Sequence, residues 1–270
     1  MAPPVFLNHF YLTLDRATFA AVRDNDYLKT VFAPFEQRTT QRNDTSYTGI
    51  YFYGRNTYFE FFEEGSEFAK VTGSSGIALG VQQEGGVRQL AGVLADQTTL
   101  TRRTETGEPF WFHSAAPAGS QRADFFRTWV MEYHKDFLAQ WYPDLPPHKA
   151  SSLSRKNVLD RYVAKIGLDS RRGEFLLKDV THIELALAEA SRSSFLRLLE
   201  AFGYQISGAG MSVATGPEAR ILLVEPSGGG AGIRRVTMSL QRSVAGELRQ
   251  RYGSSELVIS PRGEAVWSFG

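Results

Sequence analysis

The stretch Val5-Phe-Leu-Asn-His-Phe-Tyr-Leu-Thr-Leu14 is rich in aliphatic and aromatic residues and predicts a β-strand. Asp15 follows it as a typical helix N-cap, and apolar residues recur at roughly helical spacing from Phe19 to Phe35. Three further strands are predicted over residues 36–42, 47–53 and 57–63. The turn Gly54-Arg-Asn56 joins the last two as a hairpin. The order is therefore strand, helix, strand, strand, strand.

This order recurs along the chain. The second copy has a predicted strand over 76–81, a helix over 85–96 and strands over 98–106, 109–115 and 124–134. The third opens with Val180-Thr-His-Ile-Glu-Leu-Ala-Leu187 and continues with a helix over 191–202 and strands over 204–207, 211–215 and 220–225. The fourth has a strand over 233–241, a helix over 244–252 and strands over 256–260 and 264–269, so it lacks its last strand. The predicted fold class is α+β, with tandem βαβββ modules in two paired units.

The predicted units cover residues 1–145 and 179–270, and residues 146–178 form the connector between them. The connector contains Pro146-Pro147, several serine and basic residues, and a short predicted helix over 158–166. The run Gly228-Gly-Gly-Ala-Gly232 precedes a strand and does not open a helix. It therefore predicts a flexible hairpin or hinge and not a phosphate-binding loop.

The composition restricts the partners of the chain. Among 270 residues, 30 basic side chains face 29 acidic ones, so there is no overall positive field to hold nucleic acid. The chain has no cysteine, so any metal must use His, Asp or Glu. No apolar run reaches the roughly 18 residues of a membrane span, and the N-terminus lacks a secretory pattern. We expect a cytoplasmic protein with a small-molecule substrate and neither nucleic-acid nor membrane partner; homodimerisation is left open.

Two polar residues stand on apolar strand faces. Strand alternation predicts one face with Leu7, His9, Tyr11 and Thr13, and another with Tyr58, Glu60 and Phe62. His9 and Glu60 are each the lone ionisable group of an apolar and aromatic face. Burying a carboxylate there is unfavourable unless it is paired or bound to a cation. We therefore expect His9 and Glu60 to meet. A bound metal ion would offset the cost of burying the carboxylate.

The stretches Leu7-Asn-His-Phe-Tyr-Leu-Thr-Leu14 and Asn56-Thr-Tyr-Phe-Glu-Phe-Phe62 resemble the opening and closing strands of a vicinal oxygen chelate module. A glyoxalase-like family is the nearest match. The resemblance implies two glyoxalase-like units with curved mixed β-sheets, each built from paired modules. It also implies a divalent metal in the cleft, held by residues of the first and last strands.

The resemblance implies the ligand set His9, Glu60 and Glu132. In the second module, Ser75 and Gly76 stand where the family pattern has its histidine, so that position is empty. Glu132 matches the carboxylate position on a strand whose predicted face is shared by Phe126, Thr128, Val130, Glu132 and His134. His134 or His113 could add a nitrogen ligand, and Glu132 or His134 could exchange protons with substrate. Such sets suit Fe, Mn, Zn or Ni.

The C-terminal unit is predicted to be metal-free. Thr181-His-Ile-Glu184 repeats the opening pattern of the first module, but leucines stand where Glu60 does, and Arg235 occupies the next histidine position. A single ligand does not hold a metal, so we expect His182 to be structural.

The leading functional hypothesis is a metal-dependent enzyme of the vicinal oxygen chelate type, a lyase, isomerase or dioxygenase acting on a small oxygenated metabolite. The alternative is a metal-free small-molecule binding or resistance protein that uses the same cleft, and a third hypothesis is a structural or partner-binding tandem. In the first two cases aromatic and imidazole side chains would line the substrate pocket, namely Tyr11, Tyr58, Phe62, Trp111, His113 and Phe126.

Overall fold

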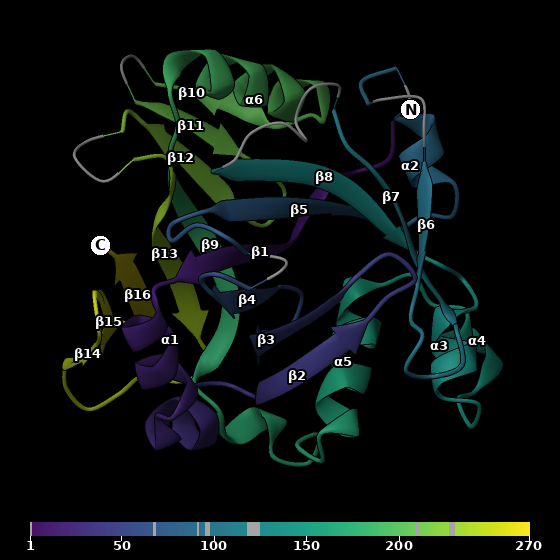
Figure 1. Ribbon diagram of the computed structural model, residues 1–270, viewed down its shortest axis with the longest axis horizontal. Helices are drawn as coiled ribbons and strands as arrows, with labels where there is room; N and C mark the ends of the chain where they lie inside the picture. Colours follow the sequence, from purple (N-terminus) through teal and green to yellow (C-terminus); the bar gives the residue numbers. More distant parts are fainter. Residues whose placement is uncertain are drawn as a thin grey trace.

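The computed structural model describes residues 2–66, 69–90, 92–94, 98–117, 125–208, 211–226 and 230–270. It has an α+β fold with two eight-stranded mixed sheets (Figure 1). The prediction of tandem modules in two curved sheets is confirmed. Part of the predicted hinge 228–232, the start of the strand predicted at Asp124 and the end of the helix predicted to Asp96 lie outside the described residues.

The first sheet is built around the strand that opens the chain. Its strands are β1 (Phe6–Leu14), β2 (Phe35–Gln41), β3 (Ser46–Tyr53), β4 (Tyr58–Glu63), β5 (Ser75–Val81), β6 (Thr99–Arg102), β7 (Phe110–Ala115) and β8 (Phe126–Tyr133). They lie in the order β2-β3-β4-β1-β5-β8-β7-β6. β1 pairs parallel with β4 and antiparallel with β5, and β5 pairs parallel with β8. The two modules thus meet at β1 and β5.

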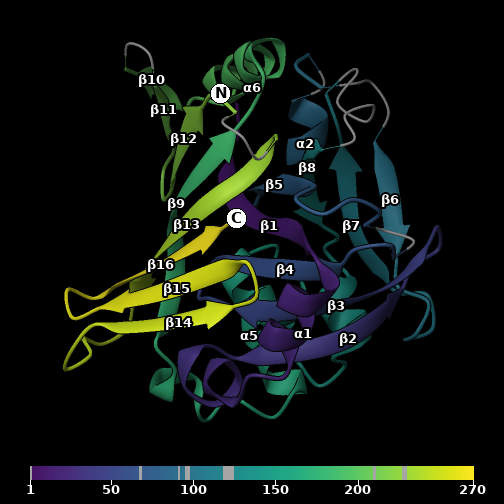
Figure 2. The same ribbon diagram turned by 60° about the vertical axis from the view of Figure 1, so that its left-hand side comes forward.

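The second sheet repeats this strand order. Its strands are β9 (Leu177–Ala186), β10 (Gln205–Ser207), β11 (Ser212–Thr215), β12 (Arg220–Val224), β13 (Gly232–Leu240), β14 (Leu248–Tyr252), β15 (Ser255–Ser260) and β16 (Glu264–Phe269). They lie in the order β10-β11-β12-β9-β13-β16-β15-β14. Figure 2 brings β14, β15 and β16 forward, in yellow.

The fourth module differs from its prediction. The helix predicted over 244–252 is wrong, because this segment contains β14, and the module has all four strands but no helix. β13 pairs antiparallel with β16, whereas β5 pairs parallel with β8. A parallel return needs a crossover of a dozen or more residues, but only residues 241–247 separate β13 from β14. The short connection therefore reverses the chain into an antiparallel arrangement.

The helices are short and lie outside the sheets. They are α1 (Arg16–Arg23), a π-helical turn (Leu28–Phe32), α2 (Gly86–Gln89), α3 (Phe137–Trp141), α4 (Pro147–Ala150), α5 (Arg155–Lys165), a 3-10 turn (Arg172–Glu174) and α6 (Glu189–Ala201). Asp15 caps α1 by accepting a hydrogen bond from Thr18 N at 2.9 Å. Within the described part of the chain, no helix has the length and apolar character needed to span a bilayer.

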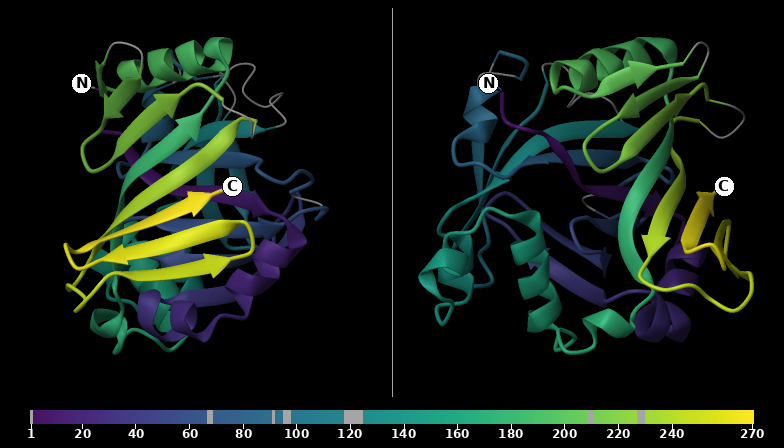
Figure 3. Two further views of the ribbon diagram at one scale, coloured as in Figure 1. Left: turned by 90° about the vertical axis from the view of Figure 1, so that its left-hand side faces the viewer. Right: turned by 180° about the vertical axis from the view of Figure 1, so that it is seen from behind.

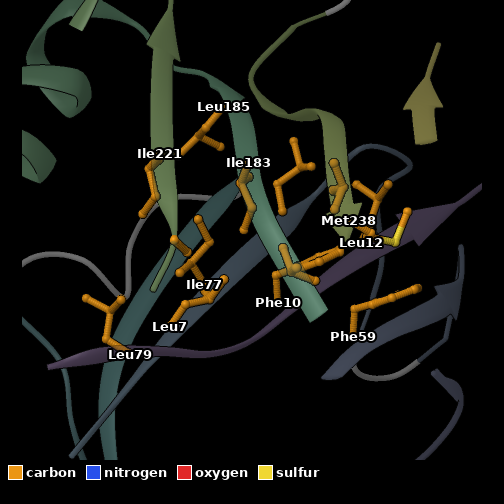
Figure 4. Packing of buried hydrophobic residues seen from close by; sticks show 14 of the residues in the cluster. Leu7, Phe10, Leu12, Phe59, Ile77, Leu79, Ile183, Leu185, Ile221 and Met238 are labelled. Atoms are coloured by element: carbon orange, nitrogen blue, oxygen red, sulfur yellow. The ribbon is translucent and has the colours of Figure 1, made fainter. Parts of the chain in front are cut away.

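The two sheets share one hydrophobic core. Figure 3 shows the ribbon from two sides, and Figure 4 shows the packing of buried side chains in this core close up. The ring of Trp267 on β16 lies 5.1 Å from the ring of Phe61 on β4. Helices of each half also reach the other half: Phe195 of α6 packs against Phe126 at 5.2 Å. Burial of this common interface ties the halves into one packed body.

The segment 146–178 is more than a linker, because α5 packs on the other face of the first sheet. Tyr162 of α5 stacks on Tyr53 of β3 with ring centroids 5.6 Å apart. Arg155 is almost fully buried and donates to the carbonyl oxygens of Leu7 and Asn56. Helices α3 and α5 thereby cover one end of this face, and the rest stays open as a cleft.

Candidate functional site

The open part of this face forms a cavity of about 630 Å³. Both modules of the first sheet contribute to it. The lining residues are His9, Tyr11, Arg42, Asp44, Thr45, Tyr47, Tyr58, Glu60, Thr99, Trp111, Phe112, Ser114, Ala115, Ala116, Arg127, Thr128 and Trp129. A volume of this size matches the range of about 300–1,000 Å³ found for small-molecule sites.

A β-bulge on β1 places His9 in the cavity. The register with β5 shifts between Leu7 and His9, so Leu7 enters the core while His9 and Tyr11 turn to the cleft. The expectation that Leu7 shares the face of His9 is therefore wrong. The Nδ1 atom of His9 lies 2.9 Å from Oδ1 of Asn8, which can only accept, so Nδ1 carries the hydrogen and Nε2 the lone pair. Burial lowers the pKa of His9 from 6.5 to about 3, which keeps the ring neutral.

Glu60 lies beside this lone pair. Its Oε1 is 3.9 Å from Nε2 of His9, and both side chains are less than a tenth exposed. Burial raises the pKa of Glu60 from 4.5 to about 7, although Arg38, Tyr58 and Arg42 partly oppose the shift. The two groups form no ion pair because His9 is uncharged. Near pH 7, His9 therefore presents a neutral hydrogen-bond acceptor to the cavity, and Glu60 presents a carboxyl group that is close to half-protonated.

Aromatic rings surround the pair. His9 stacks on Tyr58 at 4.4 Å and meets Trp129 edge-on at 5.4 Å. Tyr11 lies 6.2 Å from Trp129 above the strand β5. A Cβ atom at Gly76 would come within 2.3 Å of the Tyr11 ring, so glycine is needed for these rings to meet. Ring packing thus accounts for the glycine at the position where the vicinal oxygen chelate pattern would have a histidine.

Charged groups line the remaining part of the cavity. Arg42 donates two hydrogen bonds, of 2.8 and 2.6 Å, to the carboxylate of Asp44. The opposite charges of the two residues thereby neutralise each other. Arg127 is exposed and forms no ion pair with any residue that the structure describes. The Nε1 atom of Trp111 is buried and has no hydrogen-bond partner within the described ranges. Among the lining residues that the structure describes, Arg127 is therefore the cation without a carboxylate partner.

Glu132 does not join His9 and Glu60. It pairs with Val81 and His113 on the face of β8 turned away from the cleft, and its carboxylate accepts from the backbone N–H groups of Gly85 (2.7 Å) and Val87 (2.9 Å) at the start of α2. It therefore serves as a cap for that short helix.

The two other histidines of the first unit lie near Glu132 and not near His9. The rings of His113 and His134 are 5.4 Å apart, and His134 Nδ1 lies 3.7 Å from Asp136. Partial burial lowers the pKa of His134. Neither histidine lines the cavity.

Of the six residues expected to line the pocket, Tyr11, Tyr58 and Trp111 do so. Phe62 is fully buried beneath Tyr11, at 5.9 Å. Phe126 belongs to the core between the sheets. His113 pairs with Glu132 and lies on the face of β7 that is turned away from the cleft.

The residues opposite His9 and Glu60 do not complete a metal site. On the cleft face, β5 presents Gly76, Ala78 and Gly80, while β8 presents Arg127, Trp129 and Met131. None of these positions carries a carboxylate or an imidazole. Within the described ranges no three His, Asp or Glu side chains are grouped closely enough to hold an ion. Among the residues that the structure describes, His9 and Glu60 are therefore the two donors at this place, whereas resident catalytic ions usually have three protein ligands.

The second sheet has no counterpart of the pair. His182 pairs with Arg220, and two residues further along, Glu184 pairs with Leu222, where the first sheet has Glu60. Arg235 lies 3.4 Å from Glu184 in an exposed ion pair. Nδ1 of His182 forms a hydrogen bond with Oγ1 of Thr181 at 3.1 Å.

Sequence reasoning missed Arg127 and Trp129, because it grouped the even-numbered residues of β8 as the cleft face. The odd-numbered residues Arg127, Trp129 and Met131 form that face. The aromatic and cationic residues of this set were a usable signal, since such residues line ligand pockets.

One solved structure supports the fold. A hypothetical protein from Staphylococcus aureus has a similar structure, with a TM-score of 0.54, 7% sequence identity, and coverage of 92% of this chain and 95% of that one. A xylose isomerase-like TIM barrel/4-hydroxyphenylpyruvate dioxygenase fusion protein matches at a TM-score of 0.45 and 15% identity, over 87% of this chain and 37% of that one. No curated protein matches the sequence. The model of a family of unknown function, DUF5829, matches residues 7–269, and the chain therefore belongs to that family.

Proposed function

We propose that this protein binds a small, flat organic molecule in the cavity of its first sheet, without a resident metal. The observation that carries the proposal is the buried His9–Glu60 pair, whose Nε2 and Oε1 atoms lie 3.9 Å apart on the floor of an aromatic cavity. The strands that face the pair add no further metal ligand among the described residues. Rings such as Tyr58 and Trp129 supply the apolar contact surface for a planar ligand.

The pair suits a ligand hydroxyl. Nε2 of His9 accepts a hydrogen bond, and Glu60 donates when protonated and accepts when ionised. A hydroxyl group placed between them can donate to Nε2 of His9 and accept from protonated Glu60, which satisfies both buried groups. Because the pKa of Glu60 is about 7, this carboxyl can also exchange a proton with the ligand near neutral pH.

A binding screen tests the proposal. Matched phenols and unsubstituted aromatics, such as 2-naphthol and naphthalene, are titrated against the protein with binding followed by ligand-observed NMR. We expect the hydroxylated member to bind about tenfold more tightly, and His9→Phe to abolish that difference. His182→Phe on the second sheet is the matched control and should retain it. Failure of every aromatic probe to bind would contradict the proposal.

The metal-dependent enzyme is a second candidate, a lyase, isomerase or dioxygenase acting on an oxygenated metabolite. The separation of 3.9 Å between Nε2 of His9 and Oε1 of Glu60 favours it, because both atoms could contact one Fe, Mn, Zn or Ni ion. Elemental analysis of untagged protein separates the candidates. The enzyme candidate requires one ion per chain, lost in His9→Ala and Glu60→Ala and retained in His182→Ala. The metal-free proposal expects no stoichiometric ion in any of them.

A further inference from the structure

We infer that the ligand of this cavity is an aromatic carboxylate whose anionic group binds Arg127. The inference rests on the proposed small-molecule function and specifies its ligand class. It starts from the charges of the cavity wall, where two arginines stand in different situations.

The first arginine is already neutralised. Arg42 is held by both carboxylate oxygens of Asp44, and its guanidinium also lies 5.8 Å from the ring of Phe112. An incoming anion would have to displace Asp44 to reach it. Arg42 therefore shapes the wall and leaves the cavity without net charge on that side.

Arg127 has no such partner within the described residues. It lies on β8 opposite Gly76, on the same strand face as Trp129 and two residues before it. The alternation of β8 therefore places a guanidinium next to the indole ring that flanks His9. A flat ligand lying along Trp129 would have one end at the His9–Glu60 pair on the floor of the cavity. Its other end would lie within reach of Arg127.

A carboxylate fits this end better than other oxygen groups. A guanidinium pairs with the two oxygens of a carboxylate through parallel N–H bonds, which a neutral amide of the same shape cannot match. The rings of Trp111 and Trp129 line the same cavity and supply apolar surface for the aromatic part of such a ligand. A phosphate carries up to about two negative charges, which call for more cations than the one arginine that the described lining leaves without a carboxylate partner.

The test uses pairs of compounds that differ only in charge. One-, two- and three-ring aromatic carboxylates, such as benzoate and 2-naphthoate, are compared with their primary carboxamides by calorimetry and ligand-observed NMR. We expect carboxylates to bind roughly 10- to 100-fold more tightly than amides in the native protein. The preference should disappear in Arg127→Gln and persist in Arg262→Gln, a control at an exposed arginine in the β15–β16 turn.

The outcomes separate the inference from the function on which it rests. Equal affinity of acids and amides in the native protein, or a preference for acids that survives Arg127→Gln, overturns the inference but leaves the aromatic binding function in place. Absence of binding by every compound up to about 1 mM overturns both. Arg127 is exposed, so the variant should keep the melting temperature of the native protein, and this is measured alongside.

Discussion

Nε2 of His9 lies 3.9 Å from Oε1 of Glu60, and burial drives both groups toward their uncharged forms. The shifts have opposite consequences for stability. The folded state releases the proton of His9 more easily than the unfolded chain does, and it holds the proton of Glu60 more tightly. Because burial is the main cause in both cases, each shift should survive removal of the other residue.

The first prediction concerns the pH dependence of stability. The lowered pKa of His9 gives a contribution that is present above pH 6.5 and is lost as pH falls toward 3. The raised pKa of Glu60 gives a contribution that is present below pH 4.5 and is lost as pH rises through 7. Between pH 4.5 and 6.5 the two slopes, each up to about 1.4 kcal/mol per pH unit, oppose each other and largely cancel.

Two single variants should expose these slopes. Glu60→Gln should lose stability as pH falls below 6.5, and His9→Gln should gain stability as pH falls from 7 to 4.5. The measurement is the free energy of unfolding of each variant in urea at several pH values, with the native protein, whose two slopes largely cancel between pH 4.5 and 6.5, measured alongside. His182→Gln is the control. Parallel curves for all three variants would refute the assignment of two opposed buried groups.

The second prediction concerns the glycine beneath the aromatic rings. A methyl group at Gly76 would lie 2.3 Å from the Tyr11 ring and 3.0 Å from Trp129. Gly76→Ala should therefore displace these rings, destabilise the protein by about 1–3 kcal/mol and weaken aromatic ligand binding. Gly92→Ala, where a Cβ meets nothing within 4 Å, should do neither. Thermal unfolding and the binding assay on both variants check this, and equal behaviour would contradict the packing argument.

The third prediction concerns the connector. Arg155 donates to the Leu7 and Asn56 carbonyls and pairs with Glu218 at 2.6 Å. Arg155→Met should destabilise the fold by about 2–4 kcal/mol, because two buried carbonyl groups lose their donor. Glu218→Gln should change the free energy of unfolding by less than about 1 kcal/mol, since Glu218 is well exposed and the carbonyl bonds remain. Chemical denaturation of both variants measures the difference, and similar losses would show that the ion pair dominates.

Local sequence patterns predicted most of the fold. Of the three expected ligands they placed His9 and Glu60 together, but not Glu132. His9 and Glu60 could be predicted to meet because each lies on an apolar face of a strand in the same module. The order of the module places these two strands, β1 and β4, side by side. Glu132 could not be placed. Alternation correctly groups it with Phe126 and Val130, but only the long-range pairing of β8 with β5 decides which face looks into the cleft.

Two local errors have the same origin in tertiary context. The bulge after Leu7 shifts the face of β1, and no residue there signals it. The second error is the helix predicted over 244–252, which contains Leu248–Tyr252. This segment instead pairs with β15, with alternating exposure along the strand, because its short connection to β13 permits only an antiparallel return.

The last prediction concerns the shared core. Trp267 of β16 is 1% exposed, and its ring lies 5.1 Å from Phe61 and 5.7 Å from Phe52 of the first sheet. Trp267→Ala should destabilise the protein by about 3–5 kcal/mol, the usual loss for a buried aromatic residue. Since the contacts join the two sheets, both should unfold in one cooperative transition at a lower temperature.

Hydrogen exchange followed by mass spectrometry, together with thermal unfolding, measures this. In Trp267→Ala the protection of β1 and β4 in the first sheet should fall as much as that of β13 and β15 in the second, because separating the sheets exposes the apolar faces of both. Trp141→Ala is the matched control: Trp141 packs on Tyr162 under the connector at 4.6 Å, outside the core between the sheets. Its loss should affect the first sheet and connector more than the second sheet. Two separate melting transitions, with only the second sheet shifted by Trp267→Ala, would mean that the sheets fold as independent domains and that their interface contributes little to stability.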